Sequence, residues 1–291
     1  MKVAIIGGDK RMLFCAKEFC DDNYFVTMFG FDKLQSNGPI KISNDFSSIA
    51  CFDIVVFPYP LSTNKNSDNE KKLLINAPFS KQEIYIEDIL DFIKDKIVFC
   101  SNSEKLKKYE LAKVYDYSKN EHLLTQNAEL TSEGALQTAM QEYEGSIFKS
   151  RCLVCGFGRI GKILSKMLFS LNADTCVFAR KEKDRAMAES FGIKTLSNLE
   201  NCSHDFDIIF NTVPALIIDK KVIDKLNNAT LIIDLASYPG GVDFDYAKKN
   251  NVDVIHALKL PGICAPKSAG TIIKNTIIRM TKEDPRWKRL A

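Results

Sequence analysis

Three glycines near the middle of the chain have the spacing of a dinucleotide-binding turn. Gly156, Gly158 and Gly161 form G-x-G-x-x-G within "VCGFGRIGK", after an apolar run and before a helical pattern. The first glycine of such a turn permits a tight bend, the second lets a pyrophosphate approach the backbone, and the third lets helix and strand pack closely. The helix N-terminus adds free N–H groups and a partial positive charge. We therefore expect a nicotinamide dinucleotide to contact Gly156, Phe157, Gly158, Arg159, Ile160 and Gly161.

The residues after the next strand favour NADP over NAD. An NAD site usually has an acidic residue about 20 positions further on, at the end of the second strand, where it holds the ribose hydroxyls. In "VFARKEKDR" that strand end carries Arg180, followed by Lys181. Positive charge there would attract a 2′-phosphate, and Glu182, the nearest acid, is expected to begin the next helix. NADP is the predicted cofactor, with NAD as the alternative.

A further polar segment, "NTVPA", follows a later strand. Asn211, Thr212, Val213 and Pro214 would then lie at the carboxyl edge, where open α/β sheets bind their ligands. An ordinary strand-to-helix turn would also explain them. Because the segment should lie opposite the glycine turn, we include these four residues among the expected cofactor contacts.

The elements that must position these residues form two series of alternating strands and helices. The first series has strands expected at 2–6, 25–29, 52–57 and 96–100, with helices from the "GGDKR" turn to about 20 and at 84–93. The second has strands expected at 151–155, 175–180, 207–214 and 229–237, with helices at 160–171 and 183–191. Such alternation favours parallel, doubly wound sheets, so the fold class is α/β.

Two domains and an interdomain cleft follow from this organisation. Residues 1–130 are expected to form a small flavodoxin- or Rossmann-like α/β domain on the substrate side, and residues 151–265 a doubly wound Rossmann domain. A helix headed by Thr131 as its cap should link them over 131–150. Residues 266–291 should add a helix and a polar tail that pack near the domain interface.

Composition narrows the class of protein. The 291 residues are 45% hydrophobic and hold 40 Lys and Arg against 37 acids without a long block of like charge, so we expect no nucleic-acid partner. No signal peptide or membrane-length apolar run is found, which predicts a cytoplasmic protein. The nine cysteines suit free thiols, and three histidines leave little material for a metal site. In the strand "RCLVC", Cys152 and Cys155 should face opposite sides of the sheet.

Several motifs, taken together and in order, resemble the dipicolinate synthase family, in its A-type rather than its B-type subunits. They are "GGDKR", "TSEGAL", "GFGRIGK", "IIDLASYPGGVDFDYA" and "LKLPGICAPKSAGTII". The similarity covers essentially the whole chain, and the two long C-terminal motifs are much more specific than the glycine turn. The resemblance implies the architecture of two-domain D-2-hydroxyacid dehydrogenases. It also implies oxidation of a dihydro- or hydroxytetrahydro-dipicolinate to pyridine-2,6-dicarboxylate, together with a flavoprotein-like B-type subunit, in sporulating bacteria.

A cyclic dicarboxylate needs cations or free backbone N–H groups at two places. Lys267, at the start of a helix, is one candidate, and the "GGDKR" turn with Asp9 and Arg11 offers a second helix N-terminus. Thr131, Ser132 and Glu133 would head a third, although capping alone would explain Thr131. Ser237 in "ASYPGG" is available as a hydrogen-bond partner near the nicotinamide.

Aromatisation also needs a base to take a proton while hydride passes to the cofactor. Lys267, Asp234 and His256 are the candidates, but the base stays unassigned, because core packing would equally explain His256 at the end of an apolar strand. Asp243 is another choice that could simply cap a helix. The catalytic Arg and His of hydroxyacid dehydrogenases have no clear counterparts, which argues against simple 2-hydroxyacid oxidation. That activity and a non-catalytic, dinucleotide-sensing role stay as alternatives, and a homo-oligomer is compatible with all three.

Overall fold

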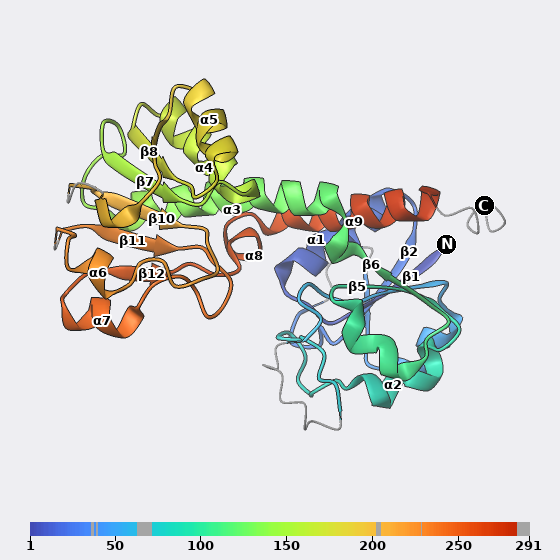
Figure 1. Cartoon of the computed structure of the whole chain (residues 1–291). Coiled ribbons are helices and arrows are strands. Elements are labelled where there is room, and N and C mark those ends of the chain that lie inside the picture. Colours follow the sequence, from blue (N-terminus) through green and yellow to red (C-terminus); the bar gives the residue numbers. More distant parts are fainter. Residues whose placement is uncertain (36–37, 39, 63–71, 202–204, 228, 284–291) are drawn as a thin grey trace. The chain divides into compact units, whose positions relative to one another are not determined.

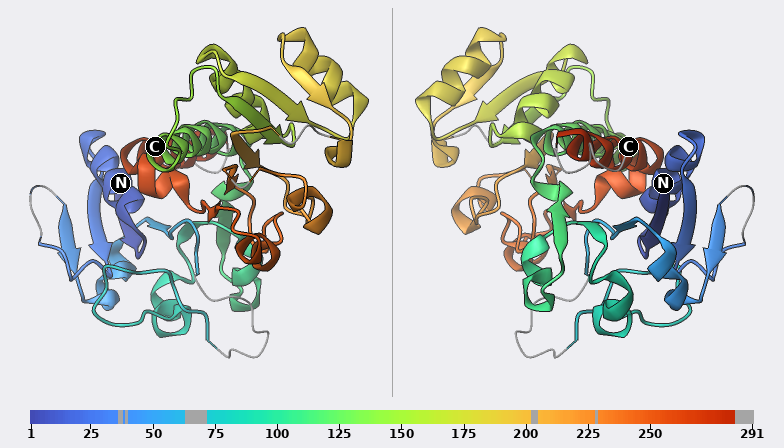
Figure 2. Two further views of the ribbon diagram at one scale, coloured as in Figure 1. Left: turned by 90° about the vertical axis from the view of Figure 1, so that its left-hand side faces the viewer. Right: turned by 90° about the vertical axis from the view of Figure 1, so that its right-hand side faces the viewer.

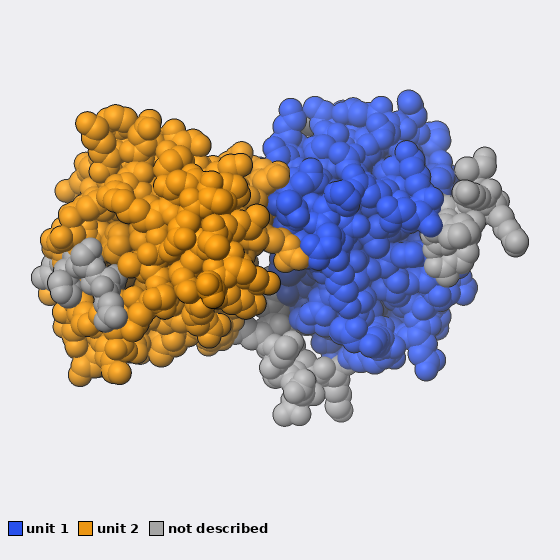
Figure 3. All heavy atoms as spheres, turned by 45° about the horizontal axis from the view of Figure 1, so that its top comes forward, with its two compact units in different colours: residues 1–126, 266–291 blue, residues 127–265 orange. Residues whose placement is uncertain are grey.

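The computed structural model describes residues 1–35, 38, 40–62, 72–201, 205–227 and 229–283 (Figure 1). Most of the polar stretch at 62–72, and the tail from 284 onward, lie outside these residues. The chain divides into two compact units, coloured separately in Figure 3. Unit 1 comprises Met1–Gln126 and Pro266–Ala291, and unit 2 comprises Asn127–Ala265.

Unit 1 contains a six-stranded parallel sheet with the strand order β3-β2-β1-β4-β5-β6. The central strands are continuous apolar runs that are buried on both faces, as is typical of parallel sheets. The elements are β1 (Lys2–Ile6), α1 (Lys10–Asp21), β2 (Phe25–Phe29), β3 (Lys41–Ser43), η1 (Phe46–Cys51), β4 (Ile54–Val56), α2 (Ile86–Ile93), β5 (Ile97–Cys100), η2 (Ser103–Tyr109), β6 (Lys113–Asp116), η3 (Tyr117–Lys119) and α9 (Pro266–Glu283).

Helices cover both faces of this sheet. Residues of η1, α2 and η2 pack into one core cluster with the sheet, and α1 packs on β2 and on α9. Figure 2 shows α9, in red, beside α1, in blue. The two helices approach closely at Gly270, where an added Cβ would lie 2.5 Å from the carbonyl oxygen of Arg11. The ammonium of Lys274, 6% exposed, also donates to Asp22. The C-terminal helix is therefore an integral part of unit 1.

Unit 2 repeats the same architecture, with a parallel sheet of order β12-β11-β10-β7-β8-β9. One face packs against α3, α4 and α8, and the other against α6 and α7. The elements are α3 (Glu121–Glu142, whose residues up to Gln126 belong to unit 1), β7 (Arg151–Cys155), α4 (Arg159–Ser170), β8 (Asp174–Phe178), α5 (Glu182–Ser190), β9 (Lys194–Leu196), η4 (Leu199–Asn201), β10 (Ile208–Asn211), α6 (Lys220–Ile223), β11 (Leu231–Asp234), α7 (Phe244–Lys249), β12 (Val254–His256) and α8 (Leu260–Cys264).

The two sheets confirm the predicted α/β class. Cys152 and Cys155 lie in different core clusters, on opposite faces of the second sheet, as expected. The cysteines that the structure describes are free thiols, and no helix within the described residues is long and apolar enough to cross a membrane.

The helix predicted to begin at Thr131 begins at Glu121 instead. Thr131 lies within α3 and donates its hydroxyl to the carbonyl oxygen of Asn127, 2.7 Å away, so it cannot cap the helix. The expected cap misled the prediction because Ser and Thr hydroxyls also bond to the preceding turn inside a helix. No helix N-terminus is therefore available to an anion at 131–133.

Candidate functional site

The glycine turn between β7 and α4 has the geometry that the dinucleotide pattern requires. Gly156 adopts φ +98°, a left-handed conformation that favours glycine. A Cβ on Gly161 would lie 2.1 Å from the carbonyl oxygen of Gly156, so only glycine lets the helix approach the strand this closely. A Cβ on Gly158 would meet no heavy atom of the described residues within 4 Å. The turn thus combines a tight bend, close packing and an open approach to the backbone.

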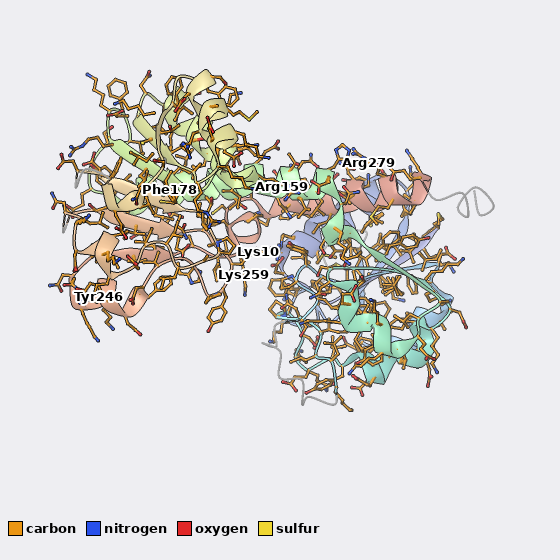
Figure 4. The ribbon with its side chains drawn as sticks, in the orientation of Figure 1. Lys10, Arg159, Phe178, Tyr246, Lys259 and Arg279 are labelled. Carbon is orange, nitrogen blue, oxygen red and sulfur yellow. The ribbon has the colours of Figure 1, made fainter. Side chains whose placement is uncertain are left out.

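The N-terminus of α4 is suited to an anion. Gly158 is the N-cap residue, and no described side chain caps the helix. Arg159, labelled in Figure 4, is the first residue of α4 and is exposed. The ring of Phe157 is buried below the turn, with the ammonium of Lys162 5.6 Å from its centroid. The first-turn N–H groups and nearby cations therefore suit a pyrophosphate.

Positive charge gathers beyond the end of β8. Arg180 and Lys181 are exposed there, and Glu182 begins α5, as the sequence predicted. Arg185, which was not predicted, donates from Nη1 to the carbonyl oxygens of Ala179 and Arg180 at 2.8 and 2.9 Å. The only signal in the sequence that could have suggested Arg185 is its position, five residues after Arg180 and across a strand-to-helix turn. These cations suit a phosphate on the ribose.

The segment after β10 lies beside the glycine turn. The Thr212 hydroxyl donates to the carbonyl oxygen of Cys155 at 2.8 Å and would lie 2.5 Å from a Cβ on Gly156. Val213 is partly exposed and Pro214 is exposed. Asn211 is fully buried, and its side chain bonds to the backbone of Val213 and to Asp234. The segment therefore shapes the turn, while the Asn211 side chain faces inward.

Asp234, at the end of β11, is completely buried, and its carboxylate accepts hydrogen bonds from neighbouring N–H groups. Oδ1 accepts from Asn211 Nδ2 at 2.8 Å and from the N–H of Ala236 at 3.0 Å, while Oδ2 accepts from the N–H of Gly241 at 2.9 Å. His256 Nε2 lies 3.0 Å from the carbonyl oxygen of Ala236. Two of the three candidate bases, Asp234 and His256, thus bond to the loop after β11, on which Ser237 is exposed. Asp243 caps α7 by accepting from the N–H of Tyr246.

In unit 1, the "GGDKR" turn carries a local ion pair. Asp9 caps α1, and its carboxylate accepts from the N–H of Arg11 at 3.0 Å and from the guanidinium at 2.7 Å. The guanidinium is buried, also donates to the carbonyl oxygen of Tyr59, and lies 5.6 Å from the centre of that ring. Burial raises the pKa of Tyr59, and Arg11 partly opposes this rise. The helix N-terminus here is therefore satisfied by Asp9, contrary to the free anion site that the turn suggested.

The remaining substrate candidates differ in accessibility. Lys267 is exposed in the first turn of α9, as predicted. Ser132 is completely buried and donates to the carbonyl oxygen of Ala128 at 2.8 Å, with the carbonyl of Ile160 at 3.4 Å. Glu133 is exposed on α3. Among the described residues, no group of three or more His, Cys, Asp or Glu could hold a metal ion.

Comparison with known proteins first defines the class. Residues 118–237 match the family described as "D-isomer specific 2-hydroxyacid dehydrogenase, NAD binding domain". This range includes the glycine turn, the cations after β8 and the segment after β10. Unit 2 thus contains a nicotinamide-dinucleotide-binding domain, and this match supports an oxidoreductase that uses a nicotinamide dinucleotide.

Further matches, which together run along nearly the whole chain, are more specific. Residues 2–117 match the family described as the N-terminal domain of the A-type subunit of dipicolinate synthase. The A-type subunit of the Bacillus subtilis synthase is 29% identical over 97% of this chain and 96% of its own length. The crystal structure of its Bacillus halodurans counterpart has a TM-score of 0.83 and 26% identity, covering 98% of each chain. That of the Bacillus subtilis protein also has a TM-score of 0.83. The resemblance to the A-type subunits of dipicolinate synthase is confirmed.

Proposed function

We propose that this chain oxidises dihydrodipicolinate, or its 4-hydroxytetrahydro form, to pyridine-2,6-dicarboxylate, with NADP as the preferred oxidant and a B-type subunit of the synthase as partner. For the dihydro substrate, one hydride passes to the nicotinamide and one proton leaves, so the ring becomes aromatic. The hydroxytetrahydro form must also lose water. The substrate and partner are those implied by the resemblance to the A-type subunits of dipicolinate synthase.

The observation that carries the proposal is the glycine turn with its open approach at Gly158 and its uncapped helix. Because the strand order reverses between β7 and β10, a dinucleotide is expected to lie across these two strands. Its adenosine half then lies toward β8, where Arg180, Lys181 and Arg185 favour a 2′-phosphate. Its nicotinamide half lies toward β10 and β11. The bound cofactor would supply the hydride acceptor, and the protein would orient it.

The substrate's two carboxylates require cations beyond the cofactor. We assign one to Lys267, whose ammonium is exposed at the start of α9. Arg11 is less available, since its guanidinium is buried against Asp9. A substrate-side role for unit 1 is part of the same proposal.

The test combines the purified chain and its B-type partner with the precursor and either NADP or NAD. We expect pyridine-2,6-dicarboxylate to form, as measured by its ultraviolet absorbance. Reduced dinucleotide should form in equal amount, and turnover should need a lower concentration of NADP than of NAD. Absence of product with a competent B-type partner would overturn the proposal. Tight NADP binding without hydride transfer would instead favour a dinucleotide-sensing role.

A second candidate is oxidation of simple D-2-hydroxy acids, which the match of residues 118–237 favours. The distinguishing observation is turnover of lactate-like substrates by the chain alone. We expect no such turnover, because the catalytic Arg and His of hydroxyacid dehydrogenases have no clear counterparts in this sequence.

A further inference from the structure

The loop after β11 is anchored by hydrogen bonds near both of its ends and contains one large, mostly exposed side chain. Its first and last parts are tied to the same buried carboxylate, because Asp234 accepts from the N–H groups of Ala236 and Gly241. The backbone of Gly240 packs so closely on this carboxylate that a Cβ would lie 2.5 Å from Oδ2. Between these anchors, the side chain of Tyr238 is 71% exposed.

A second loop is bound to the first. The carbonyl oxygen of Gly241 accepts from the N–H groups of Ile217 and Ile218 at 3.1 and 3.0 Å, and Asn211 Nδ2 donates to Asp234. Hydrogen bonds therefore join the two loops directly. Leu216, 61% exposed, belongs to this second loop. Two large exposed side chains therefore follow β10 and β11 at the carboxyl edge of the sheet.

That edge is the nicotinamide side of the proposed cofactor site. The pyrophosphate is expected at the turn after β7 and the ribose phosphate after β8, so the reacting ring must lie above β10 and β11. A phenol ring fixed there can stack against a flat ring substrate, and aromatic pairs contribute beyond the area that they bury. An exposed aromatic residue on a mobile loop would lose part of this gain in ordering entropy.

We propose that Tyr238 contacts the ring of the cyclic dicarboxylate, and that Asp234 and Asn211 are positioning residues for its loop. This inference rests on the proposed function. It also removes Asp234 from the candidate bases, because both oxygens are used within the protein and the residue is fully buried. A general base must instead reach the proton that it removes.

The experiment measures two affinities of the full-length chain in the presence of its B-type partner. One is for NADP, and the other is for pyridine-2,6-dicarboxylate with NADP bound, both by isothermal titration. Tyr238→Ala should weaken the binding of pyridine-2,6-dicarboxylate about 3- to 10-fold, the range of an aromatic contact. The affinity for NADP should stay within about 2-fold of the wild-type value. Tyr238→Phe should bind like the wild type, because the ring is kept.

Two controls isolate the ring contact. Phe148→Ala removes an aromatic side chain of unit 2 that is 54% exposed but precedes β7, at the opposite edge of the sheet, and should change neither affinity. Heptanedioate, an acyclic dicarboxylate of equal charge, should bind the wild type and Tyr238→Ala equally. Unchanged pyridine-2,6-dicarboxylate affinity in Tyr238→Ala would overturn the inference.

Asp234→Asn separates positioning from base catalysis. A positioning role predicts weaker binding of pyridine-2,6-dicarboxylate, because one of the two oxygens that receive N–H groups is lost and the loop shifts. A base would leave that affinity intact and lower kcat alone, which would refute the positioning role. If the wild type binds no NADP, or binds NADP but no dicarboxylate, the proposed function itself fails, and that result is distinct from a failed Tyr238 contact.

Discussion

The two units have the same sheet but differ at the turn where a dinucleotide would bind. Counted along the chain, the strands of each unit follow the order third, second, first, fourth, fifth and sixth. In both, the helix that follows the first strand begins at the fourth residue after it, at Lys10 after Ile6 and at Arg159 after Cys155. Fold alone therefore does not decide which unit holds a nucleotide.

Both turns also begin in the same way. Gly7 and Gly156 have positive φ angles of 68° and 98°. The N–H of Gly7 donates to the carbonyl oxygen of Phe29 at 2.9 Å, and that of Gly156 to Phe178 at 2.8 Å. The first glycine thus serves the bend from strand to helix in each unit, and it says nothing about a ligand.

The difference lies at the helix cap. Unit 1 has Asp9 there, whose carboxylate accepts from the N–H of Arg11 and pairs with its guanidinium. Unit 2 has Gly158, which faces open space. A side-chain carboxylate in unit 1 occupies the position that a phosphate takes at a helix N-terminus. Met12, buried, also stands where unit 2 has Gly161. The comparison indicates that the cap residue, rather than the fold, assigns dinucleotide binding to unit 2.

The largest expected effect comes from copying the cap of unit 1 into unit 2. Gly158→Asp should weaken NADPH binding by more than about 100-fold, because a carboxylate near a phosphate at an effective dielectric of 20 costs about 4 kcal/mol. Folding should be kept, since Gly158 faces open space. NADPH fluorescence titration and a thermal melt measure the two effects.

Gly158→Asn is the matched control, because it has the same size without the charge. It should bind NADPH more tightly than Gly158→Asp. Equal losses in the two variants would mean that bulk, and not charge, excludes the cofactor.

The next effect concerns the stability of unit 1. Asp9→Ala should lower the free energy of unfolding by about 2–3 kcal/mol, since it removes a helix cap and leaves the buried Arg11 guanidinium without its carboxylate. Urea unfolding measures this loss. Asp45→Ala removes another cap, at η1, for which the described residues provide no arginine partner, and should cost about 1 kcal/mol or less. Similar losses in both variants would contradict the importance of the ion pair.

The sequence predicts the parts of this comparison that are local. Continuous apolar runs and glycine spacing were enough to place β1, β2, β7 and β8, together with the turn at 156–161. The edge strands β3, β6 and β9 were missed, because they have three or four residues that are half-buried or exposed and so lack an apolar run. The start of α3 was missed for a related reason, since its first turns are rich in polar residues.

Long-range pairing could not be predicted in the same way. Asn211 and Asp234 are 23 residues apart, and only the parallel register of β10 and β11 places them opposite each other. The sequence therefore suggested Asp234 as a base and Asn211 as a cofactor contact, without any sign that their side chains bind each other. Asp9 and Arg11 were likewise each predicted as substrate contacts, although their pairing satisfies both.

A smaller effect tests the cations after β8. Arg180→Ala should weaken the binding of NADP about 10-fold, as expected for one charged hydrogen bond. It should change the affinity for NAD by less than about 2-fold. Lys183→Ala removes a nearby exposed charge from α5 and should affect both cofactors slightly and equally. Equal loss of NAD and NADP in Arg180→Ala would remove the argument for a 2′-phosphate.

The smallest expected effect is a pH dependence of the free energy of unfolding that comes from unit 1, where Asp116 ends β6. Burial acts to raise the pKa of Asp116, but hydrogen bonds from Ser118 and Ser103 outweigh it, so the pKa lies below its ordinary value. This carboxylate therefore contributes stability above its unfolded pKa, about 3.9, and the contribution is lost as pH falls through the lower folded pKa. Asp116→Asn should be less stable than the wild type at pH 7, with the difference shrinking below about pH 4. Urea unfolding at several pH values measures it, and a difference that stayed constant down to pH 2 would show that the ionised carboxylate does not contribute.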